Sequence, residues 1–163
     1  GGSVTAGLTY SVWRGGRWMY HAAFEDRLHA LGMNVTMFNG GTPATGPWLM
    51  ERCLSARVPH VPDLILVEYA VNCEQKDLAV YERLIRALAN LTQVVAVHAH
   101  WWKCARNMRL AEPRQDHPRY AGVEARMRQI ERQYRVPTVA LADLVRGRRH
   151  ANNTDFMQDC RHP

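Results

Sequence analysis

The sequence predicts an α/β fold, a three-layer α/β/α domain built on a flavodoxin-like parallel sheet of about five strands. Apolar runs of strand length alternate along the chain with amphipathic segments of helical period. Strand, helix, strand, helix, strand is the order typical of a parallel sheet with crossover helices on both faces. The 163 residues contain no internal repeat or interdomain linker, so we expect one domain spanning 1–163.

The first predicted elements are a helix and a short strand. Residues 18–31 place apolar side chains on one helical face, and Gly32 is a plausible stop. Val35 to Phe38 then reads as a strand that runs into a glycine-rich turn.

The middle of the chain predicts a buried strand followed by a helix. The apolar run Asp63–Asn72, after Pro62, is typical of a strand buried on both faces. Asp77 to Leu91 is amphipathic, and the apolar residues expected on its inner side are Leu78, Tyr81, Leu84, Ile85 and Leu88.

The last predicted elements repeat the same alternation. Residues 93–102 read as a second buried strand, and Tyr120–Tyr134 as a helix that ends before Pro137. Residues 138–144 read as a further strand. We also expect a strand before Gly1, because the first helix otherwise lacks a sheet partner upstream.

Composition narrows the classes of function. With 47% hydrophobic and 22% charged residues the chain is typical of soluble globular domains, and no apolar run approaches the 18 or so residues of a membrane span. The net charge is +6, but only 146–150 is densely basic and no zinc-finger or aromatic RNA-binding pattern accompanies it. We therefore expect no nucleic-acid partner. Oligomeric state is not encoded in any recognisable pattern.

Cysteines and sequons indicate the compartment. The four cysteines form no C-x-x-C pair, so a structural zinc site is not expected. Three N-x-T sequons begin at Asn34, Asn90 and Asn152, in a chain with few Ser and Thr residues. Together with the even cysteine count they favour N-glycosylation and secretion or the lumen of the secretory pathway.

The two ends of the sequence carry a candidate catalytic site. Ligands of open α/β sheets bind outside the carboxyl ends of the strands, so the segments after each strand are the candidates. Ser3 lies among small residues that let a substrate approach its hydroxyl. His162 is the candidate base that takes its proton, and Asp159, three residues earlier, is the candidate partner of the other ring nitrogen.

A tetrahedral intermediate also needs donors for its oxyanion. The Ser3 amide, backbone of residues 39–46 and the Asn72 carboxamide are the candidates. Taken singly, residues 39–46 could be no more than a turn, and Asn72 a strand-ending cap. Their order along the predicted sheet edge favours the catalytic interpretation.

Four segments resemble the conserved blocks of the SGNH (GDSL-type) hydrolases. Gly1-Gly-Ser-Val-Thr resembles the first block with Gly2 in place of Asp, and Asn39-Gly-Gly-Thr-Pro-Ala-Thr-Gly resembles the second. Asp63 to Asn72 resembles the third, with Cys73 replacing its acid, and Asp159-Cys-Arg-His-Pro matches the last. The likeness is to GGS-type members found in plants and algae. It implies that the first strand and the last helix of the fold lie beyond the ends of this sequence.

The resemblance implies roles for individual residues. Ser3 would be the nucleophile, His162 the general base and acid, and Asp159 its orienting acid; the amides of Ser3 and Ala44 and the Asn72 side chain would hold the oxyanion. Convergence of the blocks would also bring Cys73 near Cys160, where a disulfide could pin the catalytic loop. Neither a metal nor an organic cofactor is expected.

Three functions follow, from different classes. The first is a serine esterase that cleaves acyl esters, with acetyl groups on carbohydrate as one candidate substrate. The second passes the same acyl group to a glycan hydroxyl. The third is a non-catalytic carbohydrate-binding module, which the departures at Gly2, Ala44 and Cys73 keep open. Trp48 and the segment from His98 to Trp102 are candidate pocket walls, although side chains of these kinds at strand ends are commonly part of the core rim.

Overall fold

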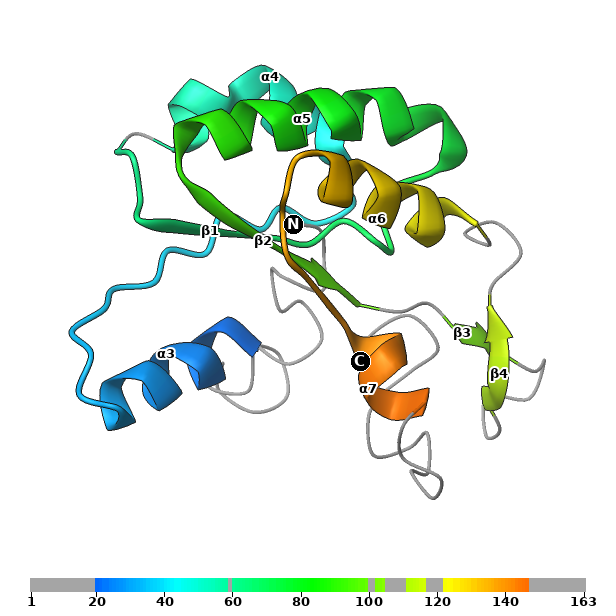
Figure 1. The fold of residues 1–163 in the computed structure, drawn as a ribbon, viewed down its shortest axis with the longest axis horizontal. Helices are drawn as coiled ribbons and strands as arrows, with labels where there is room; N and C mark the ends of the chain where they lie inside the picture. Colours follow the sequence, from blue (N-terminus) through cyan, green and yellow to red (C-terminus); the bar gives the residue numbers. More distant parts are fainter. Residues whose placement is uncertain (1–19, 59, 100–101, 105–110, 117–121, 147–163) are drawn as a thin grey trace.

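The computed structural model describes residues 20–58, 60–99, 102–104, 111–116 and 122–146 of the chain. Its elements are α3 (Tyr20–Ala30), α4 (Pro47–Arg57), β1 (Leu64–Val67), η1 (Gln75–Asp77), α5 (Leu78–Leu91), β2 (Gln93–His98), β3 (Trp102–Cys104), β4 (Ala111–Asp116), α6 (Val123–Gln133), β5 (Thr138–Ala140) and α7 (Leu141–Arg146). Figure 1 shows α4, α5 and α6 on one side of the strands and α3 and α7 on the other. The α/β class predicted from the sequence is confirmed.

The central sheet is parallel. Its order is β1-β2-β5, with Leu64 opposite Gln93 at one end and His98 opposite Ala140 at the other. Since the strands are added in one direction and parallel crossovers are right-handed, α5 and α6 must lie on the same face, as Figure 1 shows. Three parallel strands are present in the part of the chain described, of the five or so expected.

Helix α5 is the principal cover of the sheet. It is preceded by a capping box in which the Glu74 amide donates to the Asp77 carboxylate at 3.0 Å. At its other end the Thr92 hydroxyl donates to the Pro62 carbonyl at 2.6 Å, which ties the helix exit to the start of β1. The capping box fixes the start of the helix locally, and the Thr92 bond fixes its exit relative to the strand that leads to the candidate site.

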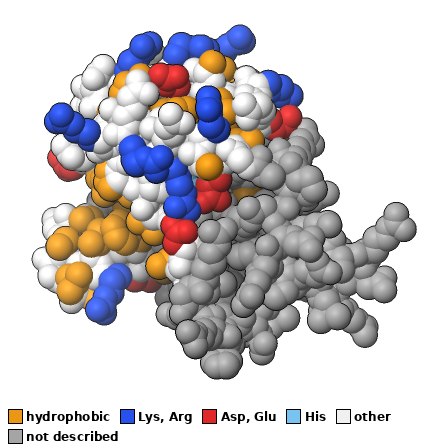
Figure 2. Space-filling model, turned by 45° about the vertical axis from the view of Figure 1, so that its right-hand side comes forward, with side chains coloured by type: hydrophobic (Ala, Val, Ile, Leu, Met, Phe, Trp, Pro, Cys, Tyr) orange, Lys and Arg blue, Asp and Glu red, His pale blue; other side chains and the backbone are white. Residues whose placement is uncertain are grey.

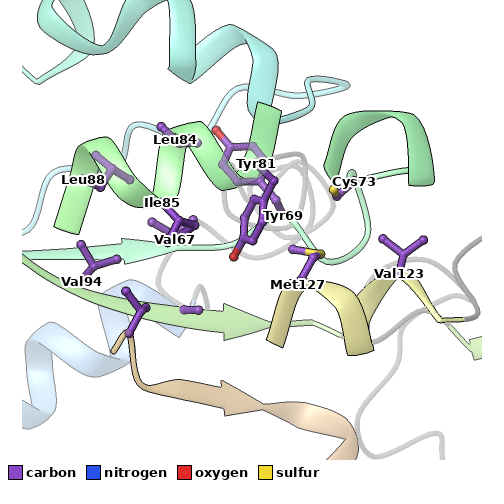
Figure 3. Packing of buried hydrophobic residues seen from close by; sticks show 12 residues of the cluster. Val67, Tyr69, Cys73, Tyr81, Leu84, Ile85, Leu88, Val94, Val123 and Met127 are labelled. Carbon is purple, nitrogen blue, oxygen red and sulfur yellow. The ribbon is translucent and has the colours of Figure 1, made fainter. Parts of the chain in front are cut away.

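The core lies between the sheet and this helical layer. Tyr81, Leu84, Ile85 and Leu88 are the buried residues of α5, which confirms the inner side predicted from their spacing. They pack with Val67 and Val94 from the strands and with Val123 and Met127 from α6 (Figure 3). Burial of this continuous apolar cluster is the main stabilising contribution visible in the described residues.

Several boundaries differ from the sequence prediction. The helices expected at 18–31, 77–91 and 120–134 are present as α3, α5 and α6, although residues 18–19 and 120–121 lie outside the description. Residues 35–38 form no strand and pair with no described strand, and β2 is the only described neighbour of β1. Since an isolated strand leaves its backbone groups without ladder partners, the predicted strand is wrong in this structure.

The three buried strands are also shorter than expected. Pairing of β1 ends at Val67, and the chain turns at 70–72. Pairing of β2 ends at His98, and Trp102 belongs instead to β3, which pairs antiparallel with β4. The strand expected over 138–144 ends at Ala140, where α7 begins. Helix α4 and the β3–β4 pair were not predicted.

Candidate functional site

The carboxyl ends of the parallel strands place Asn72 at one edge of the sheet. Strand β1 ends at Val67, and a turn closed by the Asn72 amide on the Tyr69 carbonyl (2.8 Å) follows. Strand β2, parallel to β1, ends at His98 on the same edge. This edge is where ligands bind in open α/β sheets.

Residues 39–46, which resemble the second SGNH block, are held by their own side chains. The Asn39 side-chain oxygen accepts from the Gly41 amide at 2.9 Å, and the Thr45 hydroxyl donates to the Thr42 carbonyl at 2.7 Å. Arg57, at the end of α4, donates to the Thr42 hydroxyl oxygen at 3.2 Å. Local polar contacts of this kind favour a turn over helix or strand.

Ala44 occupies the position where the SGNH-like pattern implies a glycine. Its φ of 55° lies in the left-handed region, which glycine adopts freely and alanine only at a cost. The backbone at Ala44 therefore has a conformation that glycine would adopt without strain. Ala44 itself is exposed.

Gly46 brings this segment against Asn72. A methyl group added to Gly46 would lie 3.2 Å from the Asn72 backbone carbonyl oxygen and 3.1 Å from Trp48 Cδ1. The side-chain oxygen Oδ1 of Asn72 is buried and accepts no hydrogen bond within the described part of the molecule. A buried oxygen without a hydrogen bond is costly, so packing of the described residues does not account for its position.

The remaining predicted site residues fall outside the description. Ser3, Asp159 and His162, together with Cys160 and Asn152, are not among the described residues. The structure therefore brings together the second and third blocks, while the meeting of Ser3 with His162 stays a prediction. The sequon residues Asn34 and Asn90 are both exposed.

Cys73 follows the oxyanion candidate directly and is fully buried. It pairs with no described cysteine, and its Sγ lies 3.7 Å from the Glu74 carbonyl oxygen. Cys160 lies outside the described residues, so the expected disulfide stays a prediction. Burial, with the charges of Asp77 and Glu74, raises the pKa of Cys73 to about 12. A thiol that stays protonated at neutral pH is a poor nucleophile, so Cys73 does not replace the serine.

A second polar cluster lies inside the core. Glu131 of α6, with no exposed surface, accepts hydrogen bonds from the Tyr81 hydroxyl (2.6 Å) and from the Thr138 hydroxyl, and contacts His98 Nε2 at 2.7 Å. The other ring nitrogen, Nδ1, is 3.6 Å from the Glu124 carboxylate. The network joins β2, α5, α6 and β5, one residue from each except α6, which supplies both acids.

The electrostatics of this cluster favour an ion pair. Burial alone would lower the pKa of His98, but Glu124 and Glu131 raise it to about 9. Burial would raise the pKa of Glu131, yet its contacts with His98, Thr138 and Tyr81 lower it overall. His98 is 1% exposed, so it is a core residue rather than a pocket wall. His100 and Trp101, which were considered with it, lie outside the described residues.

Two further findings concern ligands and membranes. In the described ranges, no three His, Cys, Asp or Glu side chains gather as metal ligands would. None of the helices described there combines the length and apolar character of a membrane-spanning segment. Figure 2 shows Lys and Arg side chains scattered among acidic and apolar ones on the face it presents.

Comparison with known proteins places the fold. No protein-family model matches the chain, and no curated protein sequence does. Among solved structures, a serine-to-alanine variant of the esterase AlinE4 superposes with a TM-score of 0.66 at 14% identity, covering 99% of this chain and 82% of that one. The psychrotrophic esterase EstA from Pseudoalteromonas sp. gives 0.65 at 15% identity, covering 97% and 81%.

A third solved structure, a protein from Lactobacillus plantarum, gives a TM-score of 0.59 at 18% identity, covering 86% of this chain and 78% of that one. At these identities the similarities show a shared fold. The α/β architecture predicted from sequence pattern is thus also the architecture of two proteins described as esterases.

Two features of these sites were not predicted from the sequence. The first is that Gly46, rather than Ala44, lies against Asn72. The dipeptide Gly46–Pro47 is typical of a helix start and could have indicated that α4 begins here. The second is Glu131, which carried no local signal, because an acid within the amphipathic segment 123–133 is normally exposed.

Proposed function

We propose that this chain is the catalytic domain of a serine ester hydrolase of the SGNH type. Ser3 attacks the ester carbonyl, His162 takes the serine proton and returns it to the leaving alcohol, and Asp159 holds the imidazole. The Ser3 and Ala44 amides and the Asn72 side chain hold the oxyanion of the tetrahedral intermediate. An acyl-serine intermediate forms and is then hydrolysed by water.

The observation that carries this proposal is the carboxamide of Asn72. It stands at the carboxyl edge of a parallel sheet, against the second block, with a buried oxygen that takes no hydrogen bond among the described residues. The place of this carboxamide, beside a loop in the glycine-type conformation, suits a role in binding substrate. In that role the Nδ2–H group would donate to the oxyanion, and the buried Oδ1 is left to accept from another donor. Two of the proteins with a similar fold, AlinE4 and EstA, are described as esterases, which supports ester hydrolysis as the reaction.

Acetyl esters of carbohydrates are the substrate class that we propose. They fit the proposed secretory location, to which the exposed sequon residues Asn34 and Asn90 lend support. Glycosylation itself is tested by a loss of mass when the protein, isolated from its native compartment, is treated with a peptide N-glycosidase. Absence of any mass change would overturn the proposed modification without affecting the hydrolase.

Active-site labelling of the complete protein tests the catalytic proposal. A fluorophosphonate should label one serine, identified by peptide mapping as Ser3, and Ser3→Ala should abolish both labelling and acetate release. Ser11→Ala, a second serine of the same amino-terminal stretch, is the matched control and should retain both. If wild type and Ser3→Ala are equally inert towards a panel of acyl esters, the domain is a binding module.

Asn72→Ala tests the oxyanion assignment separately. Loss of one such donor lowers kcat by about 10²–10³ with little change in KM. Asn39→Ala removes a carboxamide whose oxygen is already used within the loop, and it should lower kcat far less.

A further inference from the structure

Trp48 stands beside the proposed oxyanion site with much of its ring in solvent. It is 44% exposed, although Gly46 and Pro47 immediately before it are buried. A methyl group on Gly46 would lie 3.1 Å from Trp48 Cδ1, 3.3 Å from Nε1 and 3.2 Å from the Asn72 carbonyl oxygen. The position of this methyl group therefore lies between the indole and the Asn72 backbone.

Gly46 lets the indole lie close to the Asn72 turn. Because Gly46 has no side chain, the five-membered part of the ring can approach the backbone closely. Any larger residue at position 46 would push Trp48 or the Asn72 turn away. The ring is thus held at the edge of the sheet rather than folded into the core, where most of its apolar surface would be buried.

The indole is apolar, and polar groups lie near Trp48 in the sequence. They are the Thr42 hydroxyl and the Asn39 carboxamide of the preceding loop and the Arg57 guanidinium at the end of α4, which take part in exposed hydrogen bonds. A pyranose ring offers one face of C–H groups for the indole and a rim of hydroxyls for polar neighbours.

We propose that Trp48 determines specificity by stacking on a pyranose ring of the ester's alcohol part, next to the oxyanion site. This inference rests on the proposed function and names the residue that selects its substrate. Trp48 touches substrate but no reacting atom, so it contributes mainly to binding.

Paired kinetics test the assignment. With acetylated xylobiose, Trp48→Ala should raise KM about tenfold, and Trp48→Phe should restore part of the loss. With ethyl acetate, which has no ring, kcat/KM of Trp48→Ala should stay within about twofold of wild type. Leu91→Ala removes a similarly exposed apolar side chain at the far end of α5. It should change neither KM nor kcat/KM with either ester.

Binding without hydrolysis separates this inference from the catalytic proposal. Unacetylated xylotetraose should bind Ser3→Ala protein, measured by calorimetry, and the binding should fall about tenfold when Trp48→Ala is added. Equal effects of Trp48→Ala on both esters, or no effect on either ester or on xylotetraose, would overturn the inference. Loss of Ser3-dependent hydrolysis with Trp48-dependent xylotetraose binding intact would instead overturn the hydrolase and leave the stacking role standing.

Discussion

Replacing Glu131 by glutamine removes the charge at the centre of the buried network while keeping the shape of the side chain. Glu131 has no exposed surface and contacts His98 Nε2 at 2.7 Å, Tyr81 Oη at 2.6 Å and the Thr138 hydroxyl. In the variant the imidazolium of His98 keeps only Glu124, at 3.6 Å, as an acid partner among the described residues. Breaking one side of a buried ion pair costs about 3–5 kcal/mol.

The pKa of His98 gives a magnitude for the whole cluster. Its rise from 6.5 to about 9, against the opposing effect of burial, is due to Glu124 and Glu131 together and corresponds to about 3 kcal/mol of stabilisation of the folded state. Because the folded-state pKa is raised, this contribution is complete below pH 6.5 and is lost as the pH rises through 9. Because the pKa of Glu131 is lowered, its contribution is complete above 4.5 and is lost as the pH falls further.

The assay is urea unfolding followed by circular dichroism, at intervals from pH 5 to pH 10. We expect Glu131→Gln to lower the free energy of unfolding by about 3–5 kcal/mol near pH 6, with a smaller difference from wild type near pH 10. The matched control is Glu51→Gln, which breaks the Arg83 contact at 2.6 Å on the surface and should cost less than about 1 kcal/mol.

Two results would refute this reasoning. One is an equal loss of stability in Glu131→Gln and Glu51→Gln, since the same substitution breaks a contact of nearly the same length in both. The other is a difference between wild type and Glu131→Gln that does not shrink between pH 6.5 and 10. Either would mean that His98 is not held as a cation by Glu131.

Two further predictions concern the candidate site. Ala44→Gly should raise the free energy of unfolding by about 1 kcal/mol in urea titrations, because the positive φ of 55° is relieved, whereas Ala87→Gly within α5 should lower it by about as much; the same sign for both would contradict the strain at Ala44. Cys73 should resist iodoacetamide at pH 8 in the folded protein and react in 6 M guanidinium chloride, because burial protects the thiol and raises its pKa to about 12; rapid alkylation of Cys73 in the native state, located by peptide mapping, would be inconsistent with its burial.

The parts of the candidate site that lie within one short segment could be predicted from the sequence. Asn72 at the end of an apolar run, and a glycine-rich segment after a short extended one, are visible in the sequence because parallel strands align their carboxyl ends. The closeness of Gly46 to Asn72 could not be predicted. The two residues are 26 positions apart, and no pattern in either segment indicates that it packs against the other.

The sequence by itself determined the class of fold and three of the helices, α3, α5 and α6. Apolar residues at a 3.6-residue period fix which side of α5 is buried, whatever that side packs against, and the same holds for α6. Tertiary structure alone decided where strands stop. The apolar run Asp63–Asn72 would suit a longer strand, but pairing ends at Val67 although β2 continues to His98, because the chain turns away at 70–72, where the Asn72 amide donates to the Tyr69 carbonyl. The burial of Glu131 was likewise decided by His98, Tyr81 and Thr138, which reach it from three other elements, and a carboxylate enters a core only when such distant partners arrive together.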